Sequence, residues 1–293
     1  MTTIECVDDT RSLLGESAVW DVADGLLYWA DIDGGLLHRY DPAAGRGLAP
    51  HDVGEKVAAI AVREAGGLVI GTESGIYTYD FDTKARVKIA DPEADRPDNR
   101  FNDCVTDRQG RWWLGSFGMM RPQRAEAAFW RFNPDHSVTR WLDGVYTTNG
   151  LAFSPDGSTM YLSDSHPDVR TIWACDYDID TGMPTDRRVF FDTREVAGRP
   201  DGGTVDADGC YWMAGVGGWQ LVRLTPRGEI DMIIDMPVER PSKPMFGGPD
   251  LATLFVTSIG IGQTEGTEQP QAGSLFAVTG LPVGGVPAAR FAG

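Results

Sequence analysis

The sequence is poor in cysteine, in histidine and in positive charge. Its 293 residues include only 4 cysteines and 4 histidines, and 26 Lys and Arg are outnumbered by 43 Asp and Glu, for a formal net charge of −17. The cysteines stand far apart without a CxxC pair, which predicts reduced thiols and a cytoplasmic location. The histidines share no metal-ligand spacing. Because nucleic-acid affinity comes largely from Lys and Arg that neutralise phosphates, the charge argues against a nucleic-acid partner.

Long apolar runs and sustained helical periodicity are also missing. No apolar stretch approaches the roughly 18 residues that a membrane helix needs, so we expect no membrane partner. The first residues contain no basic region followed by an apolar run, so we expect no signal peptide. Only a segment such as residues 121–128 could form a turn or two of helix.

Glycine and tryptophan are abundant, and they recur in a repeated pattern. A turn followed by a short aromatic or β-branched strand returns six times, with the second turn residue at Gly25, Gly67, Gly110, Gly157, Gly209 and Asp250. The resulting period of roughly 40 to 50 residues is typical of propeller repeats. Each copy continues with a second short strand that ends in a polar turn, as in Leu37–Pro42 and Phe129–Pro134.

Six four-stranded repeats predict an all-β protein, a six-bladed β-propeller formed by one domain over residues 1–293. Such units cannot bury their faces alone, but they bury one another when arranged radially. Ring closure is expected to pair a strand near Ile4–Val7 with the C-terminal strands of the last blade. A two-sheet sandwich is the alternative, although its strand spacing is shorter and less regular. A propeller of this size is expected to be a monomer or a weak homo-oligomer.

Polar side chains occupy the same phase of four repeats, about eight or nine residues before the turn. They are Glu16, Asn102, Asn149 and Asp201. The second and sixth repeats offer small or apolar residues there, around Ala58–Ala59 and Lys243–Pro244. Because the innermost strands of a propeller line a central channel, the four polar side chains should converge on its axis.

Converging buried carboxylates repel one another and lose hydration unless a cation lies between them. Two carboxylates with amide oxygens suit a hard divalent ion that keeps positions open for water or substrate. The sequence therefore predicts one divalent metal ion in the channel. It does not choose among Ca, Zn, Mn and Fe(II). Taken singly, Glu16 and Asp201 could instead cap turns, and Asn149 could support a tight corner.

Several motifs resemble the senescence marker protein (regucalcin)/gluconolactonase family. They are Leu14–Trp20, Arg100–Asp103, Thr148–Gly157, Pro200–Gly202 and Met245–Gly248, in this order along the chain. The resemblance implies a six-bladed propeller that binds one divalent metal ion and hydrolyses sugar lactones. It also implies Glu16, Asn149 and Asp201 as metal ligands, and Arg100 and Asn102 as substrate-positioning residues. Asp103 belongs to the same motif as these two.

One position departs from the family pattern. Some relatives place an acidic residue that contacts the sugar in the loop where this chain has Met120, beside Arg121. An apolar residue there indicates a different substrate end, one that is less hydroxylated or anionic. Met120 is therefore the third candidate substrate-binding residue, and the sugar itself stays open.

Lactone hydrolysis needs a polarised carbonyl, a nucleophilic water and a base. Asp201 is the first candidate for the general base, and Asp103 is the second. Arg100 could bridge two ring hydroxyls or help to neutralise the oxyanion. Two other functions stay open at this point: a related propeller hydrolase of organophosphate or aryl esters, and a non-catalytic calcium-binding propeller.

Overall fold

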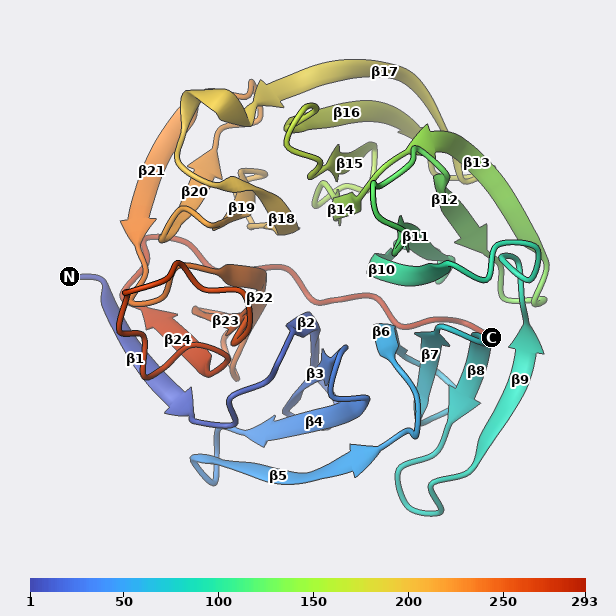
Figure 1. The fold of residues 1–293 in the computed structure, drawn as a ribbon, viewed down its shortest axis with the longest axis horizontal. Helices are drawn as coiled ribbons and strands as arrows, with labels where there is room; N and C mark the ends of the chain where they lie inside the picture. The colour runs from blue at the N-terminus through green and yellow to red at the C-terminus, as the bar shows by residue number, and fades with distance from the viewer.

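Six four-stranded antiparallel sheets are arranged around a central axis (Figure 1). The computed structural model describes all residues, 1–293. The first three blades, each from the innermost strand outward, are β2 (Gly15–Asp21), β3 (Leu26–Asp31), β4 (Leu36–Asp41), β5 (Arg46–Asp52); β6 (Val57–Val62), β7 (Leu68–Thr72), β8 (Gly75–Tyr79), β9 (Arg86–Ala90); and β10 (Asn99–Thr106), β11 (Trp112–Gly118), β12 (Ala127–Phe132), β13 (Val138–Val145). The prediction of an all-β six-bladed propeller is confirmed.

The remaining three blades follow the same plan. They are β14 (Thr148–Phe153), β15 (Thr159–Asp164), β16 (Thr171–Asp178), β17 (Met183–Asp192); β18 (Arg199–Val205), β19 (Tyr211–Val216), β20 (Gln220–Leu224), β21 (Ile230–Asp235); and β22 (Pro241–Gly247), β23 (Thr253–Ser258), β24 (Leu275–Thr279), β1 (Thr3–Asp8). The pairing of β1 with β24, which sets Ile4 opposite Val278, closes the ring as the sequence predicts.

Helix is almost absent. The one helical segment is a 3₁₀ turn over Thr193–Glu195, so no helix is long enough to cross a membrane. In the segment 121–128, where the sequence allows a turn or two of helix, residues 121–126 instead form a loop and residues 127 and 128 begin β12. These two residues pair with Val145 and Asp143 of β13.

The core lies between neighbouring blades. Because successive side chains of a strand point to opposite faces, Trp112 packs against blade two with Phe101 and Phe291, whereas Trp113 packs against blade four with Leu162. Both tryptophans are fully buried. The repeated aromatic strand is therefore explained by the need to fill both faces of each sheet.

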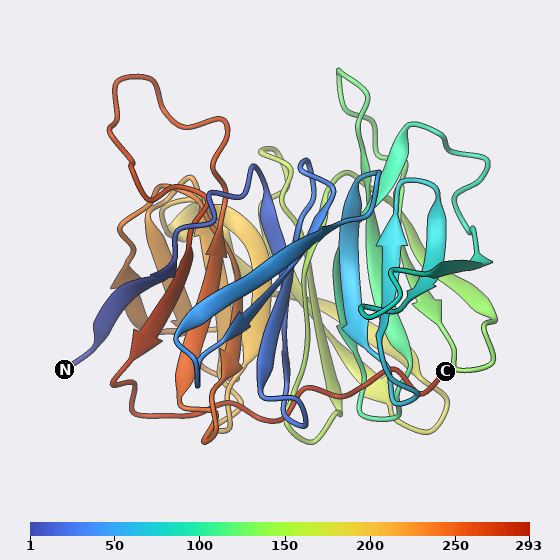
Figure 2. The same cartoon turned by 90° about the horizontal axis from the view of Figure 1, so that it is seen from below.

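The two faces of the disc differ. The innermost strands begin at one face, and the long loop between β23 and β24 rises from it (upper left in Figure 2). The C-terminal segment crosses the opposite face (bottom of Figure 2), where Gly285 pairs with Asp206 and Phe291 pairs with Arg63. The central channel is thus covered by the chain terminus at one end. We call the other end the mouth.

Candidate functional site

A β-bulge interrupts every innermost strand close to the mouth. The pairing with the second strand of the blade shifts register between Glu16 and Val19, Val57 and Ala59, Phe101 and Cys104, Asn149 and Ala152, Pro200 and Gly203, and Pro241 and Pro244. A bulge inserts an extra residue and re-aims the side chains beside it. This recurring irregularity is what turns one residue of each strand toward the axis.

Two of these bulges contain a residue in the left-handed region, directly after a candidate ligand. Ser17, with φ 54°, follows Glu16, and Gly150, with φ 66°, follows Asn149. A Cβ at Gly150 would lie 2.6 Å from the Tyr211 hydroxyl oxygen, so glycine is required there.

Glu16 and Asp201 form a pair of buried carboxylates at the mouth. Only 6% of Glu16 and 5% of Asp201 is exposed, and the two carboxyl groups are close enough to influence each other's pKa. Burial, and then the Asp103 charge, raise the pKa of Asp201 to about 7. Burial and the Asp201 charge raise the pKa of Glu16 well above its usual range. Neither carboxylate has a Lys, Arg or His nitrogen within 4 Å, so each retains oxygens for another partner.

Two asparagines complete the polar ring. The Asn149 amide nitrogen donates to Ser165 Oγ at 2.7 Å, which turns Asn149 Oδ1 toward the axis. Asn102 Nδ2 donates to that oxygen at 3.0 Å and to the Thr148 carbonyl at 2.7 Å. Ser165 in turn donates to the Pro200 carbonyl, next to Asp201. The sequence pattern contained no signal for Ser165, which orients Asn149 from a loop of the same blade.

The donor set fits a divalent cation. No three His, Cys, Asp or Glu side chains are placed to hold a metal, so the candidate set consists of the Glu16 and Asp201 carboxylates and the Asn149 amide oxygen. Two buried carboxylates that lie together without a direct ion-pair partner favour binding of a cation, because it offsets both their repulsion and their desolvation penalty. All-oxygen donors suit Ca²⁺ and related hard ions.

The carboxylate pair predicts how stability depends on pH and metal. The pKa of Asp201 is about 7 in the folded protein, against an ordinary value of 3.8. The folded state therefore binds more protons than the unfolded state between these values, and the free energy of unfolding of the metal-free protein should fall as pH rises across this window. A divalent cation should consequently raise Tm more at pH 8 than at pH 5. Thermal unfolding with chelator and with excess Ca²⁺ or Mn²⁺ measures this difference. An equal rise at both pH values would contradict it.

Arg100 stands beside the amides. Its Nη1 donates to Asn102 Oδ1 at 2.7 Å and to the Phe101 carbonyl at 2.8 Å, and its guanidinium carbon lies 4.6 Å from the centre of the Phe117 ring. Burial lowers its pKa to about 10, so it remains a cation at neutral pH. The structure therefore brings Glu16, Asn102, Asn149, Asp201 and Arg100 together at the mouth.

Asp103 points elsewhere. One of its carboxylate oxygens accepts Lys243 Nζ at 2.7 Å and the other accepts the Leu151 amide at 2.7 Å, and both charged side chains are fully buried. Burial alone would lower the pKa of Lys243, but the Asp103 charge and hydrogen bond raise it above the usual value. The description of the Lys243–Pro244 position as small or apolar was wrong for Lys243. The sequence did offer a signal for this ion pair: Lys243 is a lysine at the position of the sixth repeat where four other repeats carry the polar site residues.

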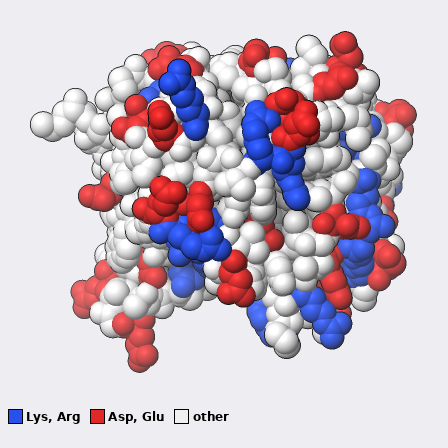
Figure 3. Space-filling model, turned by 90° about the horizontal axis from the view of Figure 1, so that it is seen from above, with Lys and Arg blue, Asp and Glu red and all other residues white.

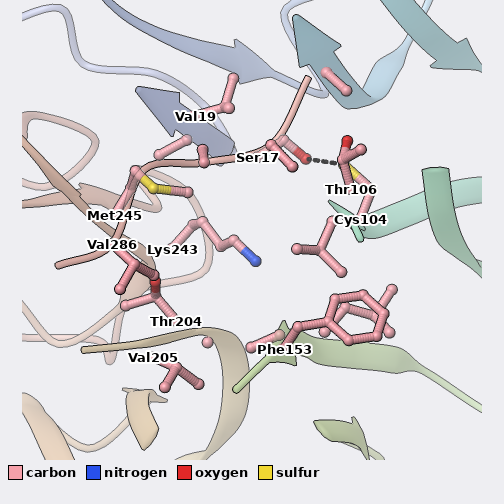
Figure 4. A pocket seen from close by; sticks show the side chains of 18 of the residues that line it. Ser17, Val19, Cys104, Thr106, Phe153, Thr204, Val205, Lys243, Met245 and Val286 are labelled. Carbon is pink, nitrogen blue, oxygen red and sulfur yellow. Dashed lines mark hydrogen bonds between the residues drawn. The ribbon is translucent and has the colours of Figure 1, made fainter. Parts of the chain in front are cut away.

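A cavity of about 70 Å³ lies below this ion pair. Its walls come mainly from apolar side chains that follow the site residues along the inner strands, and residues 286–289 of the C-terminal segment close it. Lys243 is one of the residues that line it, and its ammonium group points toward the middle of the ring of lining side chains in Figure 4. Lys243 thus separates the polar mouth from an apolar lower channel.

Met120 lies on the loop between β11 and β12, at the mouth but apart from the buried cluster. Its side chain is 39% exposed. The neighbouring Arg121 uses Nη1 to bind the Gly118, Met119 and Met120 carbonyls at 3.3, 3.2 and 2.9 Å. The loop therefore presents an apolar and a cationic side chain to the mouth.

Comparison with known proteins assigns the family. A model of the SMP-30/Gluconolactonase/LRE-like region matches residues 14–260. The chain is 36% identical over 294 residues to 6-deoxy-6-sulfogluconolactonase of Pseudomonas putida, covering 99% of both chains. It is 33% identical over 297 residues to regucalcin of Xenopus laevis, covering 99% of this chain and 98% of that one.

A solved structure agrees with these relatives. The calcium-binding protein regucalcin from Agrobacterium tumefaciens strain C58 matches with a TM-score of 0.89 at 28% identity, over 98% of this chain and 96% of that one. Because the family model covers most of the chain and the relatives align along nearly all of it, the chain belongs to the SMP-30/gluconolactonase/LRE-like family.

Proposed function

We propose that this protein is a metal-dependent sugar lactonase that hydrolyses an aldonolactone to the corresponding sugar acid. The observation that carries the proposal is the pair of buried, neighbouring carboxylates, Glu16 and Asp201, with the Asn149 amide oxygen beside them and a buried guanidinium at their edge. Membership of the family and the lactonase name of the Pseudomonas relative support it.

Glu16, Asn149 and Asp201 would hold the divalent ion. Such an ion, when bound, supplies Lewis acidity for the lactone carbonyl. Hard oxygen ligands fit Ca²⁺, and they also accept Mn²⁺, Zn²⁺ or Fe²⁺. The calcium-binding description of the Agrobacterium neighbour makes Ca²⁺ the first ion to test.

Asp201 is the better placed of the two candidate bases. A base near pKa 7 accepts a proton from water efficiently at neutral pH, and burial brings the pKa of Asp201 to about 7. Both oxygens of Asp103 are already occupied by Lys243 and the Leu151 amide. We therefore assign proton acceptance from the attacking water to Asp201, and neutralisation of Lys243 to Asp103.

Arg100 and Asn102 would orient the lactone. The hydrogen bond between them fixes the guanidinium plane, and Arg100 Nε and Nη2 donate to no protein atom. These N–H groups are available to ring hydroxyls, or to the oxygen that becomes negative when water adds to the carbonyl. Positioning of this kind lowers the entropic part of the barrier.

The test is a substrate panel measured with metal-stripped and metal-restored protein. We expect hydrolysis of at least one aldonolactone, loss of that activity after chelation, and recovery with Ca²⁺, Mn²⁺, Zn²⁺ or Fe²⁺ in turn. The panel includes a phosphotriester and an aryl ester. Faster turnover of either compound would replace the lactonase proposal by the ester-hydrolase alternative, and metal binding without any turnover would favour a non-catalytic propeller.

A further inference from the structure

Arg100, Arg121, Arg199 and Arg240 are among the arginines near the mouth that have no carboxylate oxygen within 4 Å, although the chain carries a net charge of −17. On the side of the disc that Figure 3 shows, by contrast, acidic and basic side chains are interspersed. Cations without an ion-pair partner at the entrance of a site favour an anionic ligand.

Arg100 and Arg121 form the centre of this group because they share one aromatic ring. Their guanidinium carbons lie 4.6 and 5.5 Å from the centre of the Phe117 ring. Each uses only Nη1 toward protein acceptors, so Nε and Nη2 of both remain free. The free nitrogens of Arg100 are not sealed from solvent, and Arg121 is an exposed residue. Two guanidinium groups that contact the same aromatic ring therefore keep N–H donors that no protein atom uses.

The surrounding charges leave this pair without an anion. Asp33, Glu16 and Asp201 attract Arg100 from a distance, while Arg121 repels it. Asp33 is paired with Lys56, and Glu16 and Asp201 are the candidate metal ligands.

Within the loop itself, the nearby acid is already used. Glu126 lies 3.7 Å from Arg124, and Met120 adds no charge beside Arg121. An oxyanion between the two guanidinium groups would relieve their repulsion and accept charge-assisted hydrogen bonds in the fork geometry that arginine favours.

We propose that Arg121, with Arg100, binds an anionic group on the exocyclic end of the substrate, so that the preferred lactone carries a carboxylate, sulfonate or phosphate. The inference rests on the proposed lactonase function and names its substrate class. Arg100 then serves both parts of the substrate: its Nη1 side is fixed on Asn102 near the ring, and its free edge faces the loop that carries Arg121. Met120 covers the apolar part of the substituent.

The experiment compares glucono-1,5-lactone with its counterparts that carry a carboxylate, a sulfonate or a phosphate at C6. We expect wild-type kcat/KM to be about 10-fold or more higher for at least one anionic lactone, in line with the strength of charge-assisted hydrogen bonds. The KM for that substrate should rise with ionic strength, whereas the KM for the neutral lactone should not. The three anionic arms identify which oxyanion fits.

Three variants locate the effect. Arg121→Gln should lower kcat/KM for the anionic lactone about 10-fold or more and change that for the neutral lactone less than about 2-fold. Arg121→Lys should lose less, because it keeps the charge without the fork. Arg124→Gln, which removes an exposed arginine of the same loop, should change neither substrate.

Two results would overturn the inference: a wild-type preference for the neutral lactone, or an equal loss of both substrates in Arg121→Gln. A protein that hydrolyses the neutral lactone only would disprove the anionic substrate class and leave the lactonase proposal intact. A protein inactive on all four lactones would disprove the proposed function itself.

Discussion

Replacing Asp201 by Asn is expected to lower kcat for lactone hydrolysis by about 10³-fold while the propeller stays folded. The substitution keeps the size of the side chain but removes the charge and the ability to accept a proton. It also removes one of two candidate carboxylate ligands, so the affinity for the divalent ion should fall. Steady-state kinetics with saturating metal separates loss of the base from loss of the ion.

The same substitution should not destabilise the metal-free protein at pH 8. Burial and the neighbouring Asp103 charge raise the pKa of Asp201 to about 7, so the ionised carboxylate is the unfavourable form inside the fold. A neutral Asn relieves that repulsion, and it should flatten the fall of stability between pH 4 and 7 that we expect for the wild type. The increase of Tm on adding Ca²⁺ should shrink.

Asp168→Asn is the matched control, because Asp168 lies on the same face with its side chain 90% exposed. It should leave both kcat and Tm unchanged within error. Retention of wild-type turnover by Asp201→Asn would remove Asp201 from the mechanism. A drop of Tm at pH 8 in Asp201→Asn would show that the wild-type Asp201 carboxylate accepts a stabilising hydrogen bond and is not an unfavourable buried charge.

The fold was predictable from the sequence because its physical causes are local and repeated. The Trp112–Trp113 pair illustrates this: two large side chains on consecutive strand residues demand apolar partners on both faces of the sheet, which a radial arrangement provides. The closing strand near Ile4–Val7 was predictable too, because a ring of radially packed blades closes when a strand from one terminus pairs with the blade at the other terminus. The convergence of Glu16, Asn102, Asn149 and Asp201 followed from their common phase.

What the sequence could not supply depends on contacts between distant segments. Register shifts in the inner strands aim the site residues, yet only Gly150 carries a local signal for one. Ser165 orients Asn149 across the blade, a relation set by strand pairing. Lys243 was misjudged because its partner, Asp103, stands 140 positions away. The contacts of Arg100 and Arg121 with the same Phe117 ring likewise depend on the conformation of the loop between β11 and β12, which the sequence does not reveal.

Replacing Lys243 by Met is expected to lower the free energy of unfolding by about 3–5 kcal/mol. Met retains the apolar stem that lines the lower cavity, so the change isolates the charge. It leaves Asp103 buried and unpaired, with only the Leu151 amide as partner, and with Glu16 and Asp201 close enough to repel it. Urea unfolding in the presence of chelator measures the effect without a contribution from metal binding.

The double variant Lys243→Met/Asp103→Asn decides whether charge is the cause. The asparagine that replaces Asp103 can still accept the Leu151 amide but carries no charge, so the double variant should recover most of the lost stability, giving a large coupling energy in a double-mutant cycle. Asp103→Asn alone should also destabilise the protein, because it leaves the buried Lys243 ammonium without a carboxylate partner beside an apolar cavity. The ion pair does not stabilise the base of the site if Lys243→Met lowers the free energy of unfolding by less than about 1 kcal/mol. The same conclusion follows if the losses of stability in Lys243→Met and Asp103→Asn simply add in the double variant. Recovery of stability in the double variant would instead show that the position occupied by Lys243 and Asp103 must carry no net charge. The ion pair meets this requirement, because it adds no net charge beneath Glu16 and Asp201.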